Sequence, residues 1–488
     1  MVRLTLLSVA AFFAASLLLT AAEPGDRPRV IVLTDLSNEP DDEGSLVRFL
    51  VYANEFDVDG LIATTGVHLK AGPREDIIRR DLEAYEKVLP NLSKHATGWP
   101  SVEHLRSVTG TGQTAYGMAD VGDGKSSAGS RRIVEAVDQA DERPVWVTVW
   151  GGANTLAQAL WDVRKSRDAA AVEKFVSKLR VYAISDQDDA CQWLRTEFPK
   201  LFYIGSAGNV GGSDYWLGAW TGISGDYKNK TGVMHHYEMV DGPWLLEHIR
   251  TNHGPLGDLY PEMTHIMEGD TPSFLGLINN GLGWSVRPDF GGWGGRYKEY
   301  QPHGETRKFW TETRDSRDTV TSDQNGRSET SVYATIWRWR EHFQSDFAAR
   351  MNWCVADDFK KANHNPTAML NGDKTKNVIE LTAKVGETVK LSAEGTSDPD
   401  GDAVETRWWI YEEAGTLWDR SSRSFPADVK LTADKGPTTS FVVPSLPLSG
   451  NPPVAKPVTV HVILEVRDTG TPMLWAYRRA VVRIEPPK

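Results

Sequence analysis

Hydrophobic residues in the first two-thirds of the chain alternate between short continuous runs and helical spacing. Residues 30–33 form an unbroken apolar run rich in β-branched residues, which predicts a strand buried on both faces. Across residues 43–54 the apolar positions recur every three or four residues, which predicts a helix. Residues 58–65 return to the strand pattern. This order of strand, helix and strand predicts a βαβ unit in a parallel sheet.

The same alternation continues along the chain. It predicts strands at 145–150, 179–184 and 200–204, with helices at 129–140 and 172–178 and after the glycine turn that follows residue 150. We therefore expect an α/β domain with a mostly parallel, open sheet and helices on both faces, spanning residues 27–355.

The pattern changes after a linker predicted at residues 356–367, which contains the turn-forming run Asn-His-Asn-Pro. Short strands then alternate with turns over residues 368–488, which predicts an all-β sandwich of the immunoglobulin or cadherin type. The loop 397–402 is rich in Asp, Pro and Gly, and either a calcium site or an ordinary turn explains it. The predicted strands are 387–391, 406–411, 438–443, 458–466 and 477–482.

Residues 1–22 have the pattern of a secretory signal peptide. Arg3 precedes an apolar run at 4–19, and small residues at 20–22 predict cleavage near Ala22. A retained N-terminal anchor is the alternative, and we expect no membrane span after cleavage because no later apolar run is long enough. The protein is therefore expected to be secreted or periplasmic in a bacterium.

The amino-acid composition favours some classes of binding partner over others. The formal net charge of -12 disfavours a nucleic-acid partner, because such partners need a basic surface. The 18 Trp residues are compatible with stacking on sugar rings, although core packing also uses Trp. After export, Cys191 and Cys354 would form one disulfide bond or remain two separate buried thiols.

An acidic loop joins the first predicted strand to its helix. Asp35, Glu39, Asp41 and Asp42 place four carboxylates within eight residues at the carboxyl end of a strand, where ligands of parallel sheets gather. Their mutual repulsion is costly unless a cation or bound protons relieve it, and hard oxygen ligands suit Ca²⁺ or Mg²⁺. The alternative is that the acidic side chains only stabilise the helix N-terminus.

Other polar residues follow neighbouring strands at the same predicted edge. Carboxylate and amide side chains there could bind sugar hydroxyls. The alternatives are an ordinary loop His, a glycine turn needed for close helix packing, and solvated side chains at a helix N-terminus. The candidate substrate contacts are Asn38, Asp41, His68, Asn154, Asp186, Gln187 and Asp188.

The acidic loop and its flanking strands resemble the nucleoside hydrolase signature, in which an Asp-Thr-Asp strand end is followed by Asn-Asp-Asp and a strand ending Gly-Ile-Thr-Thr. Here the corresponding residues are Leu33-Thr34-Asp35, then Asp41-Asp42, then the run Gly-Leu-Ile-Ala-Thr-Thr at 60–65. Leu33 replaces the first Asp. Over nearly the whole chain after residue 22, the sequence more closely resembles a secreted bacterial family described as cellulose-binding, with a nucleoside-hydrolase-like domain followed by an immunoglobulin-like one.

The resemblance implies a Ca²⁺ site formed by Asp35, Asp42, Asp270 and the carbonyl oxygen of Trp150. It also implies that Asp35 removes a proton from a water on this ion, and that Asp41 holds a sugar hydroxyl. The expected activity is hydrolysis of a glycosyl bond, of either the N- or the O-glycosyl type, through attack of water on an anomeric carbon.

One departure from the nucleoside hydrolase pattern bears on catalysis. Gly269 stands where that family carries a His that assists the leaving base, so Glu268 or His265 would have to act as the acid. With Leu33, this departure supports the alternative of a non-catalytic cellulose- or carbohydrate-binding protein that keeps the fold. The sequence is also compatible with a homo-oligomer.

Overall fold

The computed structural model describes residues 27–485, apart from residues 38, 207–216, 226–234, 265, 418–424, 427–428 and 446–456. The predicted signal peptide lies outside the described residues, as do Asn38 and His265. Within the part that is described, no helix is long and apolar enough to cross a membrane.

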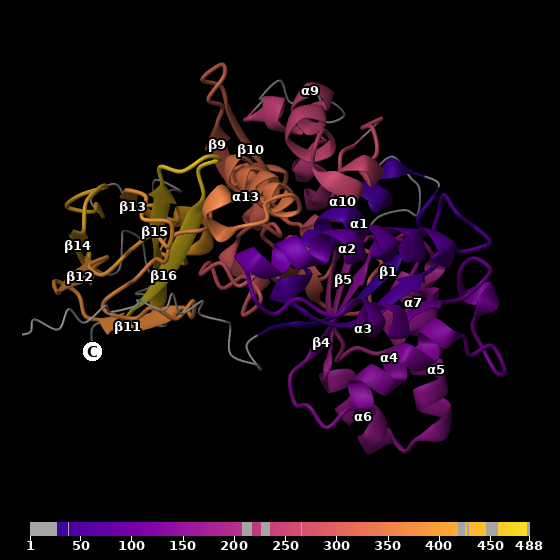
Figure 1. Cartoon of the computed structure of the whole chain (residues 1–488). Helices are drawn as coiled ribbons and strands as arrows, with labels where there is room; N and C mark the ends of the chain where they lie inside the picture. The colour runs from indigo at the N-terminus through magenta and orange to yellow at the C-terminus, as the bar shows by residue number, and fades with distance from the viewer. Residues whose placement is uncertain are drawn as a thin grey trace, which may run out of the picture.

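An eight-stranded sheet forms the centre of the α/β region, which we define as β1 to α13 (Figure 1). The strand order is β3-β2-β1-β4-β5-β6-β8-β7, and every pairing is parallel except that of β7 with β8. The strands are β1 (Arg29–Thr34), β2 (Asp57–Ala63), β3 (Thr109–Thr111), β4 (Val145–Val149), β5 (Leu179–Ser185), β6 (Phe202–Ser206), β7 (Lys298–Tyr300) and β8 (Phe309–Thr311), with a separate hairpin of β9 (Asp318–Thr321) and β10 (Ser328–Ser331).

Helices cover both faces of this sheet. They are α1 (Pro40–Val51), α2 (Glu75–His95), α3 (Val102–Ser107), α4 (Ala128–Asp138), α5 (Asn154–Ser166), α6 (Ala169–Ser177), α7 (Asp189–Glu197), α9 (Gly242–Leu245), α10 (Gly254–Leu259), α11 (Pro272–Leu275), α12 (Ala334–Trp337) and α13 (Arg340–Trp353). Shorter helical turns are η1 (Ala53–Glu55), η2 (Met118–Asp120), η4 (Ala219–Ile223), η5 (Tyr237–Val240), η6 (Leu246–Arg250), η7 (Pro288–Phe290), η8 (Arg314–Ser316), η9 (Phe359–Lys361) and η10 (Glu412–Ala414).

The side chains of β1 show how the two layers of helices are held. Val30 and Val32 point to the core that contains α1, α2 and α13, whereas Ile31 and Leu33 point to the core that contains α4, α5 and α7. All four are completely buried, as the continuous apolar run predicts. The expected architecture of a mostly parallel sheet between two helical layers is confirmed.

Two elements differ from the sequence prediction. Helix α1 begins at Pro40 instead of residue 43, because proline suits the first position of a helix, so Asp41 and Asp42 lie in its first turn. The segment 68–128, for which the hydrophobic pattern predicts no helix, contains the 21-residue helix α2. Its apolar positions do recur at helical spacing and are buried, but polar residues outnumber them.

The C-terminal β region, β11 to β16, has one sheet in the order β11-β16-β15-β13 and a second of β12 and β14. Its strands pair antiparallel except β11, which pairs parallel with β16 and was not predicted from the sequence. The two sheets share a buried apolar core. The strands are β11 (Ile379–Ala383), β12 (Thr388–Ser392), β13 (Val404–Ile410), β14 (Thr438–Val442), β15 (Val458–Asp468) and β16 (Trp475–Ile484).

The C-terminal β region packs directly against the α/β region, with α13 beside the contact (Figure 1). Tyr411 and Tyr477 belong to the same apolar cluster as Trp339 of the α/β region. At this interface the Tyr411 hydroxyl donates to Asp318 Oδ2 at 2.5 Å, and Arg479 donates to the carbonyl oxygen of Leu282 at 2.7 Å. The two regions therefore share one continuous core.

The cysteines are not bridged. Cys191 and Cys354 are both buried free thiols, which selects the second of the two alternatives left open by the sequence.

Candidate functional site

Four aspartates meet at the carboxyl-end edge of the sheet, and we call them the acid cluster. Asp35 directly follows β1, Asp41 and Asp42 lie in the first turn of α1, and Asp270 precedes α11. Each is only 1–7% exposed. Carboxylate oxygens of Asp41, Asp42 and Asp270 all lie within 4.8 Å of one another, a spacing that could hold a metal ion.

Burial and mutual repulsion control the protonation of the acid cluster. Burial, followed by the charge of Asp41, raises the pKa of Asp35 to about 7. Burial, followed by the charge of Glu39, raises the pKa of Asp41 to about 7. The pKa values of Asp42 and Asp270 are also raised well above the ordinary value, first by burial and then by neighbouring carboxylates.

No basic side chain of the described residues is among the strongest influences on the pKa values of the acid cluster. These influences are burial, other carboxylates and hydrogen bonds. Thr34 donates one hydrogen bond to Asp42. Asp35 Oδ1 and Asp270 Oδ2 are buried without a hydrogen-bond partner among the residues described. Unpaired buried carboxylate oxygens are costly, so this donor set fits a hard divalent cation such as Ca²⁺.

Two glycines make room for Asp35. A Cβ atom at Gly66 would lie 1.8 Å from Asp35 Oδ2, and one at Gly151 would lie 2.3 Å from Asp35 Oδ1. Any larger residue at either position would displace the carboxylate. The turn after β4 therefore contains glycine because a carboxylate approaches its backbone, in addition to any need for helix packing.

Trp150, at the end of β4, connects the acid cluster to α11 and to the loop after β5. Its carbonyl oxygen accepts a hydrogen bond of 2.6 Å from Gln187 Nε2. Its indole nitrogen donates to Ser273 Oγ at 2.9 Å, and Ser273 in turn donates to the carbonyl oxygen of Asp270 at 2.6 Å. The carbonyl proposed as a metal ligand thus already has one partner, which leaves one lone pair for a cation.

The loop after β5 holds three predicted substrate contacts, which have different surroundings. Gln187 is buried and reaches the Trp150 carbonyl. Asp188 accepts the backbone N–H of Asn154 and caps α7, and its charge helps to raise the pKa of Asp35. Asp186 instead pairs with Arg195 through two contacts of 2.7 Å. The structure brings Gln187 and Asp188 to the acid cluster, while it commits both oxygens of Asp186 to an arginine.

The remaining predicted contacts, Asn154 and His68, differ in exposure. Asn154 is fully buried, and its amide nitrogen donates to the carbonyl oxygen of Ala115 at 2.8 Å, so it holds the adjacent loop. His68 is partly exposed and lies 3.8 Å from Glu39. His68 and Glu39 therefore lie on the solvent side of the acid cluster.

Glu268, which the sequence suggests as a catalytic acid, is already paired with other side chains. Glu268 is fully buried, forms an ion pair of 2.7 Å with Arg48 and accepts a hydrogen bond of 2.6 Å from Tyr260. Position 269 also excludes a side chain, because a Cβ atom there would lie 2.7 Å from Asp41 Oδ2 and 2.8 Å from the Trp220 ring. A histidine could not be accommodated at Gly269 without rearrangement.

Two aromatic residues at this site, Trp220 and Tyr116, are not among the contacts predicted from the sequence. Trp220 of η4 packs against Gly269 next to Asp41. Tyr116 donates from its hydroxyl to the carbonyl oxygen of Gln187 at 2.6 Å. Neither follows a predicted strand, so no local pattern marks them, although the glycine at 269 is a signal that something approaches closely.

Comparison with known proteins identifies the family. Residues 29–297 match the family described as "Cellulose-binding Sde182, nucleoside hydrolase-like domain", and residues 388–484 match "Cellulose-binding protein Sde0182, C-terminal domain". None of the curated proteins matches the sequence.

Among solved structures, one is similar over almost the whole chain. It is a nucleoside hydrolase-related hypothetical protein from Saccharophagus degradans that is associated with carbohydrate metabolism, with 38% identity, a TM-score of 0.77 and coverage of 94% of this chain and 100% of that one. The effector protein XOO4466 matches more weakly, with 10% identity, a TM-score of 0.33 and coverage of 58% of this chain and 88% of that one. The resemblance expected from the acidic loop is therefore confirmed, and the chain belongs to the cellulose-binding Sde182 family, with a nucleoside-hydrolase-like domain followed by its characteristic C-terminal domain.

Proposed function

We propose that the protein is a carbohydrate-binding protein that acts outside the cell and binds sugar at the acid cluster through a Ca²⁺ ion. The observation that carries this proposal is the set of four buried aspartates whose pKa values are raised by burial and by neighbouring carboxylates, with no basic side chain of the described chain among the strongest influences. The family description as cellulose-binding supports the sugar as ligand.

The donor set suits the proposed ion. Asp35, Asp42 and Asp270 would supply carboxylate oxygens, and Trp150 its carbonyl oxygen. The unpartnered Asp35 Oδ1 and Asp270 Oδ2 are the atoms that most need such a partner. When bound, the ion would neutralise the charge of the acid cluster, lower the pKa of a coordinated water and coordinate vicinal hydroxyl oxygens of a sugar.

Other residues would orient the sugar. Asp41 lies within the acid cluster and can accept a hydrogen bond from a hydroxyl. His68 lies on the solvent side and is placed to contact a more distant part of the ligand. Gln187 bridges the Trp150 carbonyl and the backbone N–H of Val67, and would fix the far wall of the site.

Hydrolysis of a glycosyl bond is the second candidate, and Asp35 favours it. A buried carboxylate with a pKa raised to about 7 and one unpaired oxygen is suited to removing a proton from water. Protonation of the leaving group has weaker support, because Gly269 carries no side chain and Glu268 is paired with Arg48. Binding without turnover therefore agrees better with the site.

Titration calorimetry with soluble cello-oligosaccharides tests the binding proposal. The full chain is compared in Ca²⁺ and in chelator, beside Asp42→Asn, Asp270→Asn and the control Glu43→Gln, which alters the same helical turn at a surface ion pair. We expect affinity to be lost in chelator and in both aspartate variants but kept in the control. Affinity that is unchanged in chelator and in both variants would place the sugar on another surface.

A turnover assay separates the two candidates. The wild type and Asp35→Asn are incubated with nucleosides and aryl glycosides under the conditions that support binding. Binding without product release supports the carbohydrate-binding protein. Product that appears with the wild type and not with Asp35→Asn would establish the hydrolase.

A further inference from the structure

A second group of metal-binding side chains lies at the tip of the β9–β10 hairpin, and we call it the histidine site. His235 and His236 precede and cap η5, and Asp323 follows β9. One ligand atom from each of the three lies within 4.8 Å of the others. Since Asp323 is 87 residues from His236 in sequence, only the fold brings them together.

The distances in the histidine site fit a metal better than hydrogen bonds. His235 Nδ1 lies 3.4 Å from Asp323 Oδ1, and His236 Nδ1 lies 3.4 Å from Asp323 Oδ2. A nitrogen–oxygen hydrogen bond is shorter, at about 2.7–3.2 Å. Zinc–ligand bonds of about 2.0–2.2 Å place two ligands of a tetrahedral ion about 3.4 Å apart. The spacing therefore leaves room for a small ion between the imidazoles and the carboxylate.

The backbone orients both imidazoles to one side. Neighbouring side chains in an extended segment point in opposite directions, but His236 has a left-handed backbone with φ 47°. The two rings accordingly approach to 4.5 Å between centroids. A left-handed conformation is uncommon for a residue other than glycine, and such residues are concentrated at functional sites.

The surroundings hold these ligands in place. The backbone N–H of His236 donates to Asp323 Oδ1 at 3.0 Å, which fixes the hairpin tip on the loop. Arg340 donates to the carbonyl oxygen of His235 at 2.8 Å, and Gln344 donates to that of Met239 at 2.7 Å. The site therefore rests on the first turns of α13.

Two further features are expected of a metal site. On the other side of its ring, His236 Nε2 lies 3.6 Å from Glu341 Oε2, which is longer than a hydrogen bond but places a carboxylate behind the histidine, as is common at metal sites. His235 Nδ1 is buried and has no hydrogen-bond partner in the described part of the chain. Glu238 Oε1, 3.7 Å from His236 Nδ1, is available as a fourth ligand.

An ion pair between charged imidazoles and Asp323 explains the site less well. Both nitrogen–oxygen distances exceed those of a hydrogen-bonded ion pair, and His235 Nδ1 has no hydrogen-bond partner in the described part of the chain. Arg338 and Arg340 are close enough to contribute positive charge, but Arg338 pairs with Asp318 and Arg340 donates to backbone carbonyls.

From this geometry we infer that His235, His236 and Asp323 bind one divalent transition-metal ion of the zinc type, with Glu341 supporting His236. The ligand set of two imidazoles and one carboxylate differs from the all-oxygen acid cluster and selects a different ion. The metal would tie the β9–β10 hairpin to the start of α13.

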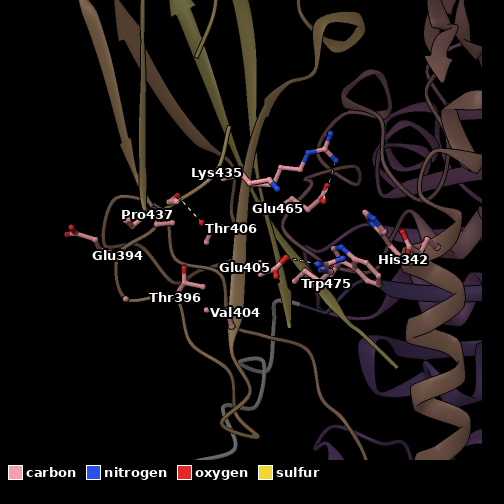
Figure 2. Close-up of a pocket in the computed structure, with 16 residues that line it drawn as sticks. His342, Glu394, Thr396, Val404, Glu405, Thr406, Lys435, Pro437, Glu465 and Trp475 are labelled. Carbon is pink, nitrogen blue, oxygen red and sulfur yellow. Dashed lines mark hydrogen bonds and ion pairs between the residues drawn. The ribbon is translucent and has the colours of Figure 1, made fainter. Parts of the chain in front are cut away.

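The histidine site borders the interface between the two regions. Glu341 also lines a cavity of about 860 Å³ between α13 and the C-terminal β region. Figure 2 shows the neighbouring His342 beside Trp475 in this cavity, and their rings stack with centroids 4.3 Å apart. A metal at the histidine site would therefore also restrain one wall of the cavity.

Metal titration of the full chain, purified without a polyhistidine tag and stripped with chelator, tests the inference. Zn²⁺ is followed by calorimetry and Co²⁺ by its visible absorption, with Ca²⁺ present to occupy the acid cluster. We expect one equivalent of Zn²⁺ and the intense absorption of four-coordinate Co²⁺. We expect both signals to be lost in His236→Gln and Asp323→Asn, and Zn²⁺ affinity to fall about ten- to a hundredfold in Glu341→Gln.

Two control variants test whether any loss of Zn²⁺ binding is specific to the histidine site. His248→Gln removes an imidazole outside the site and should bind Zn²⁺ like the wild type, as should Asp42→Asn. Circular dichroism checks the fold of each variant, and if a ligand variant does not fold, Glu341→Gln and a Zn²⁺-dependent rise in the Tm of the wild type decide the question. The inference is wrong if the wild type binds no stoichiometric Zn²⁺, or if the folded variants bind it unchanged.

Discussion

The interface and the acid cluster both contain buried carboxylates, and the chain surrounds them in opposite ways. At the interface, burial favours a raised pKa for Asp318, but the guanidinium groups of Arg296 and Arg338 outweigh it and lower the pKa below the ordinary value. In the acid cluster, burial and neighbouring carboxylates raise the pKa values of Asp42 and Asp270. The interface contains its own cations, whereas we propose that the acid cluster receives one from outside.

The largest effect is expected at the interface. Asp318→Ala would leave Arg296 buried without its partner and remove the hydrogen bond from Tyr411, at a cost of about 3–5 kcal/mol in the free energy of unfolding. Urea denaturation measures this cost. Asp76→Ala, which breaks an exposed pair with Arg74, is the control and should cost less than about 1 kcal/mol. Equal costs for the two variants would show that burial does not distinguish these pairs.

The next largest effect is that of Asp42→Asn on stability, and its sign is expected to differ with and without Ca²⁺. At a hundred times its Kd, the ion should stabilise the wild type by about 2.7 kcal/mol, and Asp42→Asn should lose that gain. In chelator the same variant should be at least as stable as the wild type, because repulsion falls while the oxygen that accepts from Thr34 is kept. Thermal unfolding in Ca²⁺ and in chelator measures both. A variant that is less stable in chelator would mean that the aspartates stabilise the fold without an ion.

Substitution of a glycine beside Asp35 should change stability by a nearly equal amount. In Gly151→Ala the new methyl group meets Asp35 Oδ1, so we expect loss of Ca²⁺-dependent stabilisation together with an overpacking cost of about 1–3 kcal/mol. Gly242→Ala is the matched control, since nothing lies within 4 Å of the position of its new Cβ atom. The same thermal measurement would contradict this prediction if Gly151→Ala responds to Ca²⁺ like the control.

Acid should weaken the interface by a smaller amount. Because the pKa of Asp318 is lower in the folded state than its ordinary value of 3.8, its contribution is complete above that value and is lost as the pH falls through the folded-state pKa. Urea midpoints measured from neutral pH into the acid range should therefore fall less steeply for Asp318→Asn than for the wild type. Parallel curves below pH 4 would show that other carboxylates control acid unfolding.

The smallest effect on stability is expected at His68. This side chain is 40% exposed, so His68→Ala should change the free energy of unfolding by no more than about 0.5 kcal/mol. If His68 contacts the sugar, calorimetry should still show weaker binding of the longer cello-oligosaccharides. Unchanged affinity for every length would remove His68 from the proposed site.

The sequence predicts the centre of the fold well and its long-range contacts poorly. β1, β4 and β5 are recognisable because strands buried on both faces carry continuous apolar runs. The acid cluster can be assembled only in part, since the loop shows Asp35, Asp41 and Asp42 together, whereas Asp270 enters through a family resemblance.

Contacts between distant residues could not be predicted from local pattern. Glu268 looks like a surface acid in sequence, and only the fold shows that Arg48, far earlier in the chain, neutralises it. The partner of Asp186 is Arg195 on the following helix, and α2 is hidden because polar residues outnumber its buried positions. Burial and pairing, which decide these roles, are properties of the tertiary structure.

The shared core at the interface also affects the order in which the chain can fold during synthesis. Trp339 packs against Tyr477 of the last strand, and the two residues are made far apart in time. At typical rates of translation, an emerging chain keeps this aromatic surface of the α/β region uncovered for on the order of ten seconds. The nascent protein is therefore most exposed to aggregation shortly before β16 is complete, and a holding chaperone would act on it in that interval.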